Sequence, residues 1–163
     1  MKKKLLSLLV SGIMVIGLSA CGAKGDGNTP GKEEVNVAVT EIGEKISTGL
    51  EFGSMIPLDD EMLKQYYGLD ASILEAYTAN PPMMNITTQE YSVFKVKDAK
   101  DVDTVKAAID KRAEAVQKSF EQYLPDQYEN AKNYYVATNG KYLVFVIHKD
   151  VDKAEEIFEG FFN

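Results

Sequence analysis

Tyr142-Leu-Val-Phe-Val-Ile-His148, preceded by Asn139-Gly140, is the stretch that decides the fold. Its residues are mostly β-branched or aromatic and are apolar on both faces, a composition typical of an interior strand. Asn-Gly is a strong hairpin signal because both residues tolerate a positive φ. We therefore predict a hairpin in which residues 134–138 form the partner strand.

Two more strands are expected upstream of this hairpin. Residues 91–97 have the composition of a strand, and residues 72–78 predict a fourth one. In the second segment, Ile73, Leu74 and Tyr77 would also suit a turn of helix, so both alternatives stay open there.

Apolar residues that recur every three or four positions predict four helices. They are Thr40 to Glu51, a short helix capped by Asp59 or Asp60 and stopped by Gly68, Val102 to Tyr123, and a last helix carrying Ala154, Ile157, Phe158, Phe161 and Phe162.

Local signals add detail to these helices. Pro125 is expected to end the long helix, and Asp152 with Glu155 resembles a capping box at the start of the last one. The residues of the short helix expected to face inward are Met62, Leu63, Tyr66 and Tyr67.

A short internal similarity supports a layout of two β-β-α units. Residues 90–97 followed by Asp101-Val-Asp103 resemble residues 141–148 followed by Asp150-Val-Asp152. Duplication and chance remain equally open, because strand-then-helix units share composition for physical reasons. The expected fold class is α+β, with a mainly antiparallel sheet of about four strands packed with helices.

The N-terminus has the features of a secretory signal. Three lysines at positions 2–4 precede an apolar run from Leu5 to Leu18. A transmembrane helix needs about 20 apolar residues, and this run is shorter. Leu18-Ser19-Ala20-Cys21 resembles the lipobox of bacterial lipoproteins, in which the cysteine thiol takes a diacylglyceryl group and becomes the new N-terminus. We predict a signal peptide at residues 1–20 and lipidation of Cys21.

The rest of the chain is expected to contain a flexible tether at residues 21–34 and a single globular domain at residues 35–163. The tether is rich in glycine and contains nothing larger than alanine to bury. Loss of residues 1–20 would remove three of 18 basic residues and no acid, so 15 basic residues would face 25 acids at a net charge of −10. Such a charge is repelled by nucleic acid, which we exclude as a partner.

The sequence also resembles a known family. Asn80-Pro-Pro-Met-Met-Asn-Ile86, then residues 91–97 and Asp98, resemble the core signature of a bacterial lipoprotein family, the domain of unknown function numbered 4358. So does the segment 101–128, with Arg112, Phe120, Pro125 and Tyr128. The similarity covers most of residues 59–162. It implies a localisation and a fold, and no activity, ligand or catalytic residue comes with it.

Candidate catalytic groups are few. His148 is the only histidine, and its place at a strand end favours an interfacial or solvent-facing role over catalysis. The Asp-x-Asp pairs at 101–103 and 150–152 could be cation ligands, but helix capping explains both without a metal. Cys21, once lipidated, leaves no free thiol. We expect no cofactor, no metal and no catalytic residue.

Two features could serve binding. Met83 and Met84 lie beside Pro81-Pro82; exposed, they would form an adaptable contact surface, and buried, they would close one end of the core, which is the alternative favoured here. Nine tyrosines suit either interfaces or the edge of a core, among them Tyr66, Tyr67, Tyr123, Tyr128, Tyr134 and Tyr135.

The function expected from the sequence is that of a non-enzymatic binding or interaction module of the cell envelope. It would be extracytoplasmic, held to the membrane by a lipid anchor, with an envelope protein or a small molecule as its partner. The alternatives are a hydrolase acting on envelope material through carboxylates alone and a structural or assembly lipoprotein.

Overall fold

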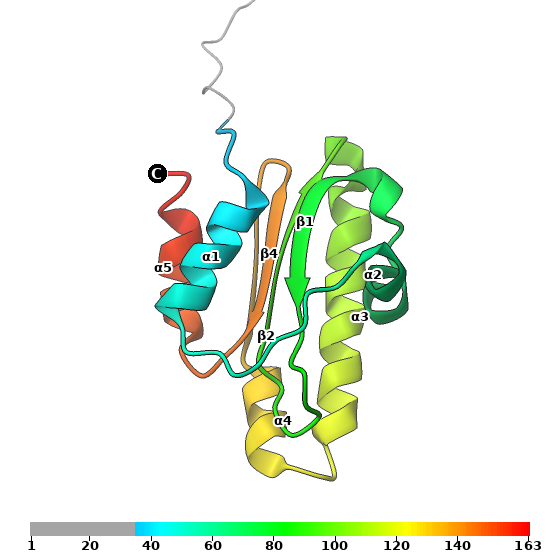
Figure 1. The fold of residues 1–163 in the computed structure, drawn as a ribbon, viewed down its shortest axis with the longest axis vertical. Coiled ribbons are helices and arrows are strands. Elements are labelled where there is room, and N and C mark those ends of the chain that lie inside the picture. Colours follow the sequence, from blue (N-terminus) through cyan, green and yellow to red (C-terminus); the bar gives the residue numbers. More distant parts are fainter. Residues whose placement is uncertain (1–34) are drawn as a thin grey trace, which may run out of the picture. The chain divides into compact units, whose positions relative to one another are not determined.

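The computed structural model describes residues 35–163, which form one compact unit. Figure 1 shows this unit as a sheet with helices on both faces. The predicted signal peptide, the predicted lipidation site at Cys21 and the predicted tether all lie outside the described residues.

The sheet has four strands in residues 35–163, and every neighbouring pair is antiparallel. The strands are β1 (Leu74–Asn80), β2 (Glu90–Val96), β3 (Tyr134–Asn139) and β4 (Tyr142–Ile147), in the spatial order β1-β2-β4-β3. All of β4 is buried, as expected for an interior strand of apolar residues. The α+β class is therefore confirmed, and segment 72–78 divides into a 3-10 turn followed by β1.

Helices cover both faces of the sheet. They are α1 (Val39–Gly49), α2 (Asp60–Tyr67), α3 (Val102–Phe120), α4 (Pro125–Lys132) and α5 (Val151–Glu159), with 3-10 turns η1 (Ala71–Ile73) and η2 (Ala99–Asp101). In Figure 1, α1 and α5 lie on one side of the sheet, and α2 and α3 lie on the other. We call these the α1/α5 face and the α2/α3 face.

Alternation along the strands divides the core between the two faces. Leu143, Phe145 and Ile147 of β4 pack with α2 and α3. Val144 and Val146 pack with α1 and α5. The apolar residues that predict the long helix lie on α3 and form part of the core on the α2/α3 face. Those that are buried are Val105, Ile109, Ala113, Val116 and Phe120.

Helix α2 begins and ends through its predicted signals. The Asp59 side chain accepts a hydrogen bond from the Met62 N–H at 2.8 Å, so Asp59 rather than Asp60 is the N-cap. Gly68 ends the helix at φ +68°, a left-handed conformation that glycine adopts at no steric cost. Leu63 and Tyr67 are buried, but Tyr66 is 37% exposed, so the inward orientation predicted for Tyr66 is wrong.

Three local predictions need correction. The two-residue hairpin loop is Gly140-Lys141, because Asn139 still pairs with Tyr142; only Gly140 of the Asn-Gly pair has left the ladder, with φ +55°. Pro125 begins α4 as well as following α3, since proline suits the first helical position, where no N–H is needed. The N-cap of α5 is Asp150, one residue before the helix begins. The proposed Asp152–Glu155 capping box is therefore wrong.

Two successive β-β-α units are present, β1-β2-α3 and β3-β4-α5. Their helices pack on opposite faces of the sheet. The rotation that carries the β1-β2 hairpin onto the β3-β4 hairpin has its axis perpendicular to the sheet, so it does not exchange the two faces. The two units therefore do not superpose with their helices included.

Candidate functional site

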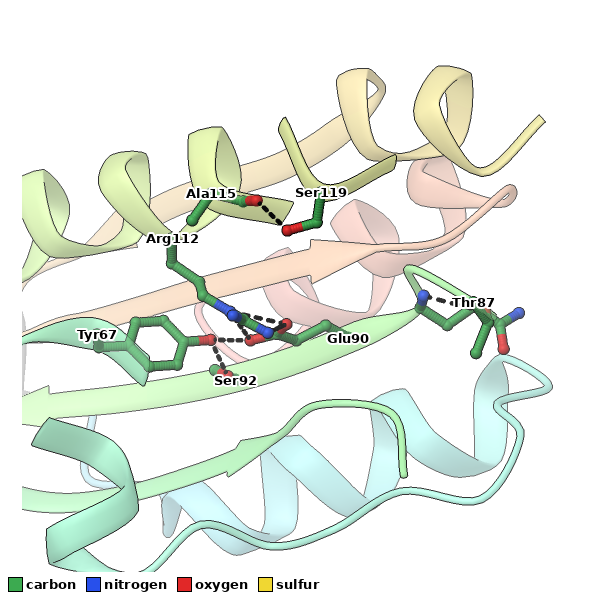
Figure 2. Close-up of polar contacts among 8 residues, drawn as sticks. Tyr67, Thr87, Glu90, Ser92, Arg112, Ala115 and Ser119 are labelled. Carbon is green, nitrogen blue, oxygen red and sulfur yellow. Dashed lines mark hydrogen bonds and ion pairs between the residues drawn. The ribbon is translucent and has the colours of Figure 1, made fainter. Parts of the chain in front are cut away.

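A buried polar cluster lies between the sheet and the α2/α3 layer (Figure 2). Glu90 begins β2 and is fully buried, and its carboxylate accepts hydrogen bonds from Arg112 of α3 and Tyr67 of α2. Arg112 Nε lies 3.1 Å from both carboxylate oxygens, and its Nη2 lies 2.6 Å from Oε2. Ser92, also buried, lies 2.7 Å from the Tyr67 hydroxyl.

The proton positions in this cluster follow from its donors and acceptors. Tyr67 has one hydroxyl proton and gives it to Glu90, so Ser92 donates its own proton to the Tyr67 oxygen. Burial, and then the negative charge of Glu90, raise the pKa of Tyr67 well above its ordinary value. The Tyr67 hydroxyl is therefore held neutral as a donor.

Arg112 is the cation of the cluster and lies between Glu90 and the Tyr66 ring. Its guanidinium carbon lies 4.8 Å from the Tyr66 ring centroid, and its side chain is 16% exposed. Burial alone would lower the pKa of Arg112, but the Glu90 carboxylate outweighs burial and the pKa is raised. Both oxygens of Glu90 are thus engaged by protein donors. The chemistry of this cluster is that of a structural ion pair joining β2 to two helices.

The loop between β1 and β2 carries the most exposed apolar residues near this cluster. Met83, Met84 and Ile86 are 64%, 55% and 53% exposed. The expected burial of the two methionines is therefore wrong, because the loop extends past the end of the sheet instead of folding onto the core. We call these three residues the apolar tip.

The base of this loop is bound to α4 by polar side chains. The Gln127 side-chain oxygen accepts the Thr88 N–H at 2.9 Å, and Asn130 donates to the Thr88 hydroxyl at 3.0 Å. Thr88 is only 1% exposed. A second set of contacts joins the loop to the segment after α1. There the Met83 N–H donates to the Ser54 carbonyl, and the Gln89 side chain accepts from the Gly53 N–H.

The tip is thus an apolar segment on a fixed polar base. Thr88 and Glu90 are two residues apart, so the brace of the loop and the buried cluster share the start of β2. This arrangement holds the three apolar side chains outward at the end of the sheet. It presents a surface suited to contact with another molecule.

A family model, the domain of unknown function DUF4358, matches residues 49–148. The chain belongs to this family. Neither a curated protein nor a solved structure matches the chain significantly. The part of the chain that matches the DUF4358 model includes the buried cluster, the apolar tip and all four strands.

His148 lies at the end of the DUF4358 match and is fully buried. Its Nδ1 accepts the Asp150 N–H at 3.1 Å, which places the proton of the neutral ring on Nε2, 3.3 Å from the Glu51 carbonyl. The expected solvent-facing or interfacial role is wrong. His148 instead joins the end of β4 to the segment that follows α1.

The two Asp-x-Asp pairs do not cap helices through their side chains. Asp101 and Asp150 are the N-cap residues of α3 and α5, but neither makes a side-chain cap hydrogen bond. Asp98 instead caps the preceding 3-10 turn, at 3.1 Å from the Lys100 N–H. Within residues 35–163 no group of three or more histidine, cysteine or acidic side chains is placed to hold a metal ion.

Sequence reasoning did not single out Glu90, and it noted Arg112 only as part of the family resemblance. A usable signal exists for both. Glu90 lies in phase with Ser92 and Phe94, so strand alternation points its side chain inward. Arg112 lies three residues after Ile109, within the apolar stripe of α3. Opposite charges at two inward positions are a signature of a buried pair.

Proposed function

We propose that this chain is a lipid-anchored, extracytoplasmic protein whose folded domain binds a partner protein through the apolar tip. The observation that carries the proposal is the exposure of three large apolar side chains within four residues, on a loop fixed by polar bonds. Single exposed apolar residues are ordinary, but a cluster on an ordered loop marks a contact surface. Burial against a partner would contribute about 1.5–3 kcal/mol for each such side chain.

The tip and the first described residues lie at opposite ends of strand β2. Asn36, near the first described residue, accepts from Lys95 near the end of β2. The tip precedes the start of β2, so the two features lie at opposite ends of this strand (Figure 1).

A non-enzymatic role is supported by the state of the buried carboxylate. Glu90 is the only buried acidic residue in residues 35–163, and Arg112 and Tyr67 engage its oxygens. Carboxylate-based hydrolysis requires two acidic groups facing a substrate. Glu90 is occupied instead in joining strand to helix. In the same range, no helix is long and apolar enough to cross a bilayer.

The binding proposal is tested by site-specific photo-crosslinking of the full chain in a bacterial host. A photoreactive phenylalanine analogue at Met84 should give an adduct of defined mass, whereas the same analogue at the exposed Glu114 on α3 should not. Serine at both Met83 and Ile86 should lower the adduct yield about tenfold, since most of the apolar contact is removed.

Tyr123 provides a matched control, because it is 63% exposed and lies outside the loop. Tyr123→Ser should leave the Met84 adduct unchanged. Equal adducts from positions 84 and 114, or no adduct above background at position 84, would contradict binding through the tip. Exposed substitutions of this kind change stability by about 0.5 kcal/mol or less, so folding is not a confounder.

The anchoring proposal is tested separately with Cys21→Ser. This variant should leave the membrane fraction or accumulate with its signal attached, because the thiol that takes the lipid is missing. Fractionation and intact-mass measurement provide the readout. Normal processing and unchanged membrane association would contradict the lipoprotein assignment without affecting the evidence for the tip.

A further inference from the structure

Within residues 35–163, the outer edge of β1 is paired only at its C-terminal end, beside Ala79 and Asn80. Residues 54–58 run antiparallel to it: the Leu58 N–H donates to the Ala79 carbonyl and the Ile56 N–H to the Pro81 carbonyl, while Met55 bridges Pro82. These contacts follow one register. Its next hydrogen-bonding position would place residue 60 opposite Tyr77, but Asp59 caps α2 and the chain leaves the edge.

The burial of β1 follows this pairing. Ala79 and Asn80, beside the paired segment, are buried, whereas the residues from Glu75 to Thr78 are partly or fully exposed. Backbone groups on one edge of a strand alternate, so Tyr77 directs its N–H and C=O outward as Ala79 does. A free sheet edge with outward backbone groups is a template for another extended chain.

A shallow hollow of about 420 Å³ adjoins the remaining part of β1, residues 74–78. Its lining comes from the start of α1, the start of α2 and β1 itself, and includes Asp60 and Glu75 but no lysine or arginine. The hollow is lined by residues 38–40 at the start of α1 and by Asp60 at the start of α2, so it lies where residues 54–58 leave the edge of β1.

The acidic residues beside this edge determine which kind of extended chain could pair with it. Asp60 accepts the Tyr77 hydroxyl at 2.7 Å, and Glu75 pairs with Lys95 while keeping its side chain 49% exposed. Burial, and after it the neighbouring Asp60 and Asp59, raise the pKa of Tyr77 to about 12. A second copy of β1 would bring another Glu75 and Asp60 to the same edge, so self-pairing is disfavoured.

From the register, the hollow and the charge, we propose that residues 74–78 of β1 bind an extended, basic peptide segment of another protein as an added strand. The added segment continues the antiparallel pairing that residues 54–58 begin. Main-chain hydrogen bonds to Tyr77 provide affinity, and a lysine or arginine beside Glu75 and Asp60 provides selectivity. This surface is separate from the apolar tip, and the proposal does not rest on the proposed function.

The probes are three fluorescein-labelled heptapeptides, measured by fluorescence anisotropy with the full chain in detergent. The first alternates valine with lysine and threonine, the second replaces each lysine with glutamate, and the third is the basic peptide N-methylated at alternate residues. The basic peptide should bind saturably, and each of the other two should bind about tenfold more weakly or worse. Equal binding of the methylated peptide, equal binding of the acidic peptide, or no saturable binding up to about 1 mM overturns the proposal.

Two substitutions at one position locate the contact. Tyr77→Pro removes the outward N–H without removing a ladder bond, and it should weaken the basic peptide about tenfold. Tyr77→Phe keeps that N–H while losing the Asp60 contact, and its affinity should stay within about twofold of the parent. If Tyr77→Pro fails to fold, as judged by circular dichroism, the N-methylated peptide decides alone. A dimer of the parent chain that Tyr77→Pro dissociates would overturn the assignment in favour of self-pairing.

Discussion

The two faces of the sheet are fixed to their helices by different physical means. On the α2/α3 face, a buried ion pair between Glu90 and Arg112 is shared with Tyr67 and Ser92. On the α1/α5 face, the packed side chains are mainly apolar and two glycines of α1 allow close approach. Its directed bonds join the segments that flank α1, from Tyr142 to Val37 and from His148 to the Glu51 carbonyl. The difference shows that a shared ion pair specifies the packing of one face, whereas shape is the main determinant of the other.

The two kinds of contact respond differently to substitutions. A directed buried bond fails when one partner is removed, because the other is left charged and unsatisfied. A shape-based contact tolerates exchange of similar volumes but not an added methyl group against a rigid neighbour. Substitutions on the two faces should therefore differ in size and even in sign.

Removing Arg112 is expected to have the largest effect. Arg112→Ala leaves the Glu90 carboxylate buried without its cation, and should lower the free energy of unfolding by about 3–5 kcal/mol. Urea denaturation followed by circular dichroism measures the loss. A loss below about 1 kcal/mol would show that the pair is not a determinant of this face.

A double substitution separates the pair from its surroundings. Glu90→Leu with Arg112→Met removes both charges, and should recover most of the stability that Arg112→Ala loses. Glu75→Ala serves as the control, since its ion pair with Lys95 is partly exposed and should contribute less than about 1 kcal/mol. A double variant as unstable as the single one would contradict the charge argument.

The parts of this molecule that the sequence predicts are those governed by local chemistry. Gly68 and Asp59 delimit α2, and the apolar run at residues 142–148 is an interior strand, because each depends on neighbours within a few positions. The loop of the hairpin lies one residue later than the Asn139-Gly140 pair predicts, because its position is set by the pairing between β3 and β4. Pro125 was misinterpreted because proline signals both a helix end and a helix start.

The candidate site was harder to predict, because its parts come from distant segments. Tyr67, Glu90 and Arg112 meet only after α2 and α3 pack on β2. Whether Met83 is buried depends on the path of a loop, which binary patterning does not determine. The burial of His148 was not predicted for the same reason, since its hydrogen-bond partner, the Glu51 carbonyl, lies 97 positions away in the sequence.

The hydroxyl of Tyr67 should have the next largest effect, and one that depends on pH. Tyr67→Phe deprives Glu90 and Ser92 of a partner and should cost about 1–3 kcal/mol at neutral pH. Because the folded chain holds this proton more tightly than the unfolded chain, the stabilisation is complete below the unfolded pKa of about 10 and is lost as the pH rises above it.

Urea titrations between about pH 9 and pH 11 test this dependence. The free energy of unfolding of the parent should fall with pH above about 10, by up to about 1.4 kcal/mol per pH unit for this one group. Tyr67→Phe should show a shallower fall. Parallel slopes in the two proteins would mean that Tyr67 is not held neutral by burial and Glu90.

A smaller effect is expected from the glycines of α1. A Cβ at Gly43 would lie 2.8 Å from the Thr78 methyl group, on a short branched side chain of β1. Gly43→Ala should therefore destabilise by about 1–3 kcal/mol, less about 1 kcal/mol gained in helix propensity. At Gly49 the conflicting atom is the far end of Ile157, which can rotate, so Gly49→Ala should be close to neutral. Thermal unfolding of both variants provides the measurement, and equal losses would contradict this distinction.

The smallest effect, with the opposite sign, is expected for Tyr135 on the α1/α5 face. Its hydroxyl oxygen is buried and has no hydrogen-bond partner within residues 35–163, and burial followed by Glu155 and Glu159 raises the pKa of Tyr135 to about 12. Tyr135→Phe therefore removes a polar group that has no bond to lose, and should be neutral or stabilising by up to about 1 kcal/mol. The same exchange of tyrosine for phenylalanine thus destabilises one face and not the other. Urea midpoints of the Tyr67 and Tyr135 variants, measured together, decide the matter, because losses of equal size would show that directed bonds hold both faces alike.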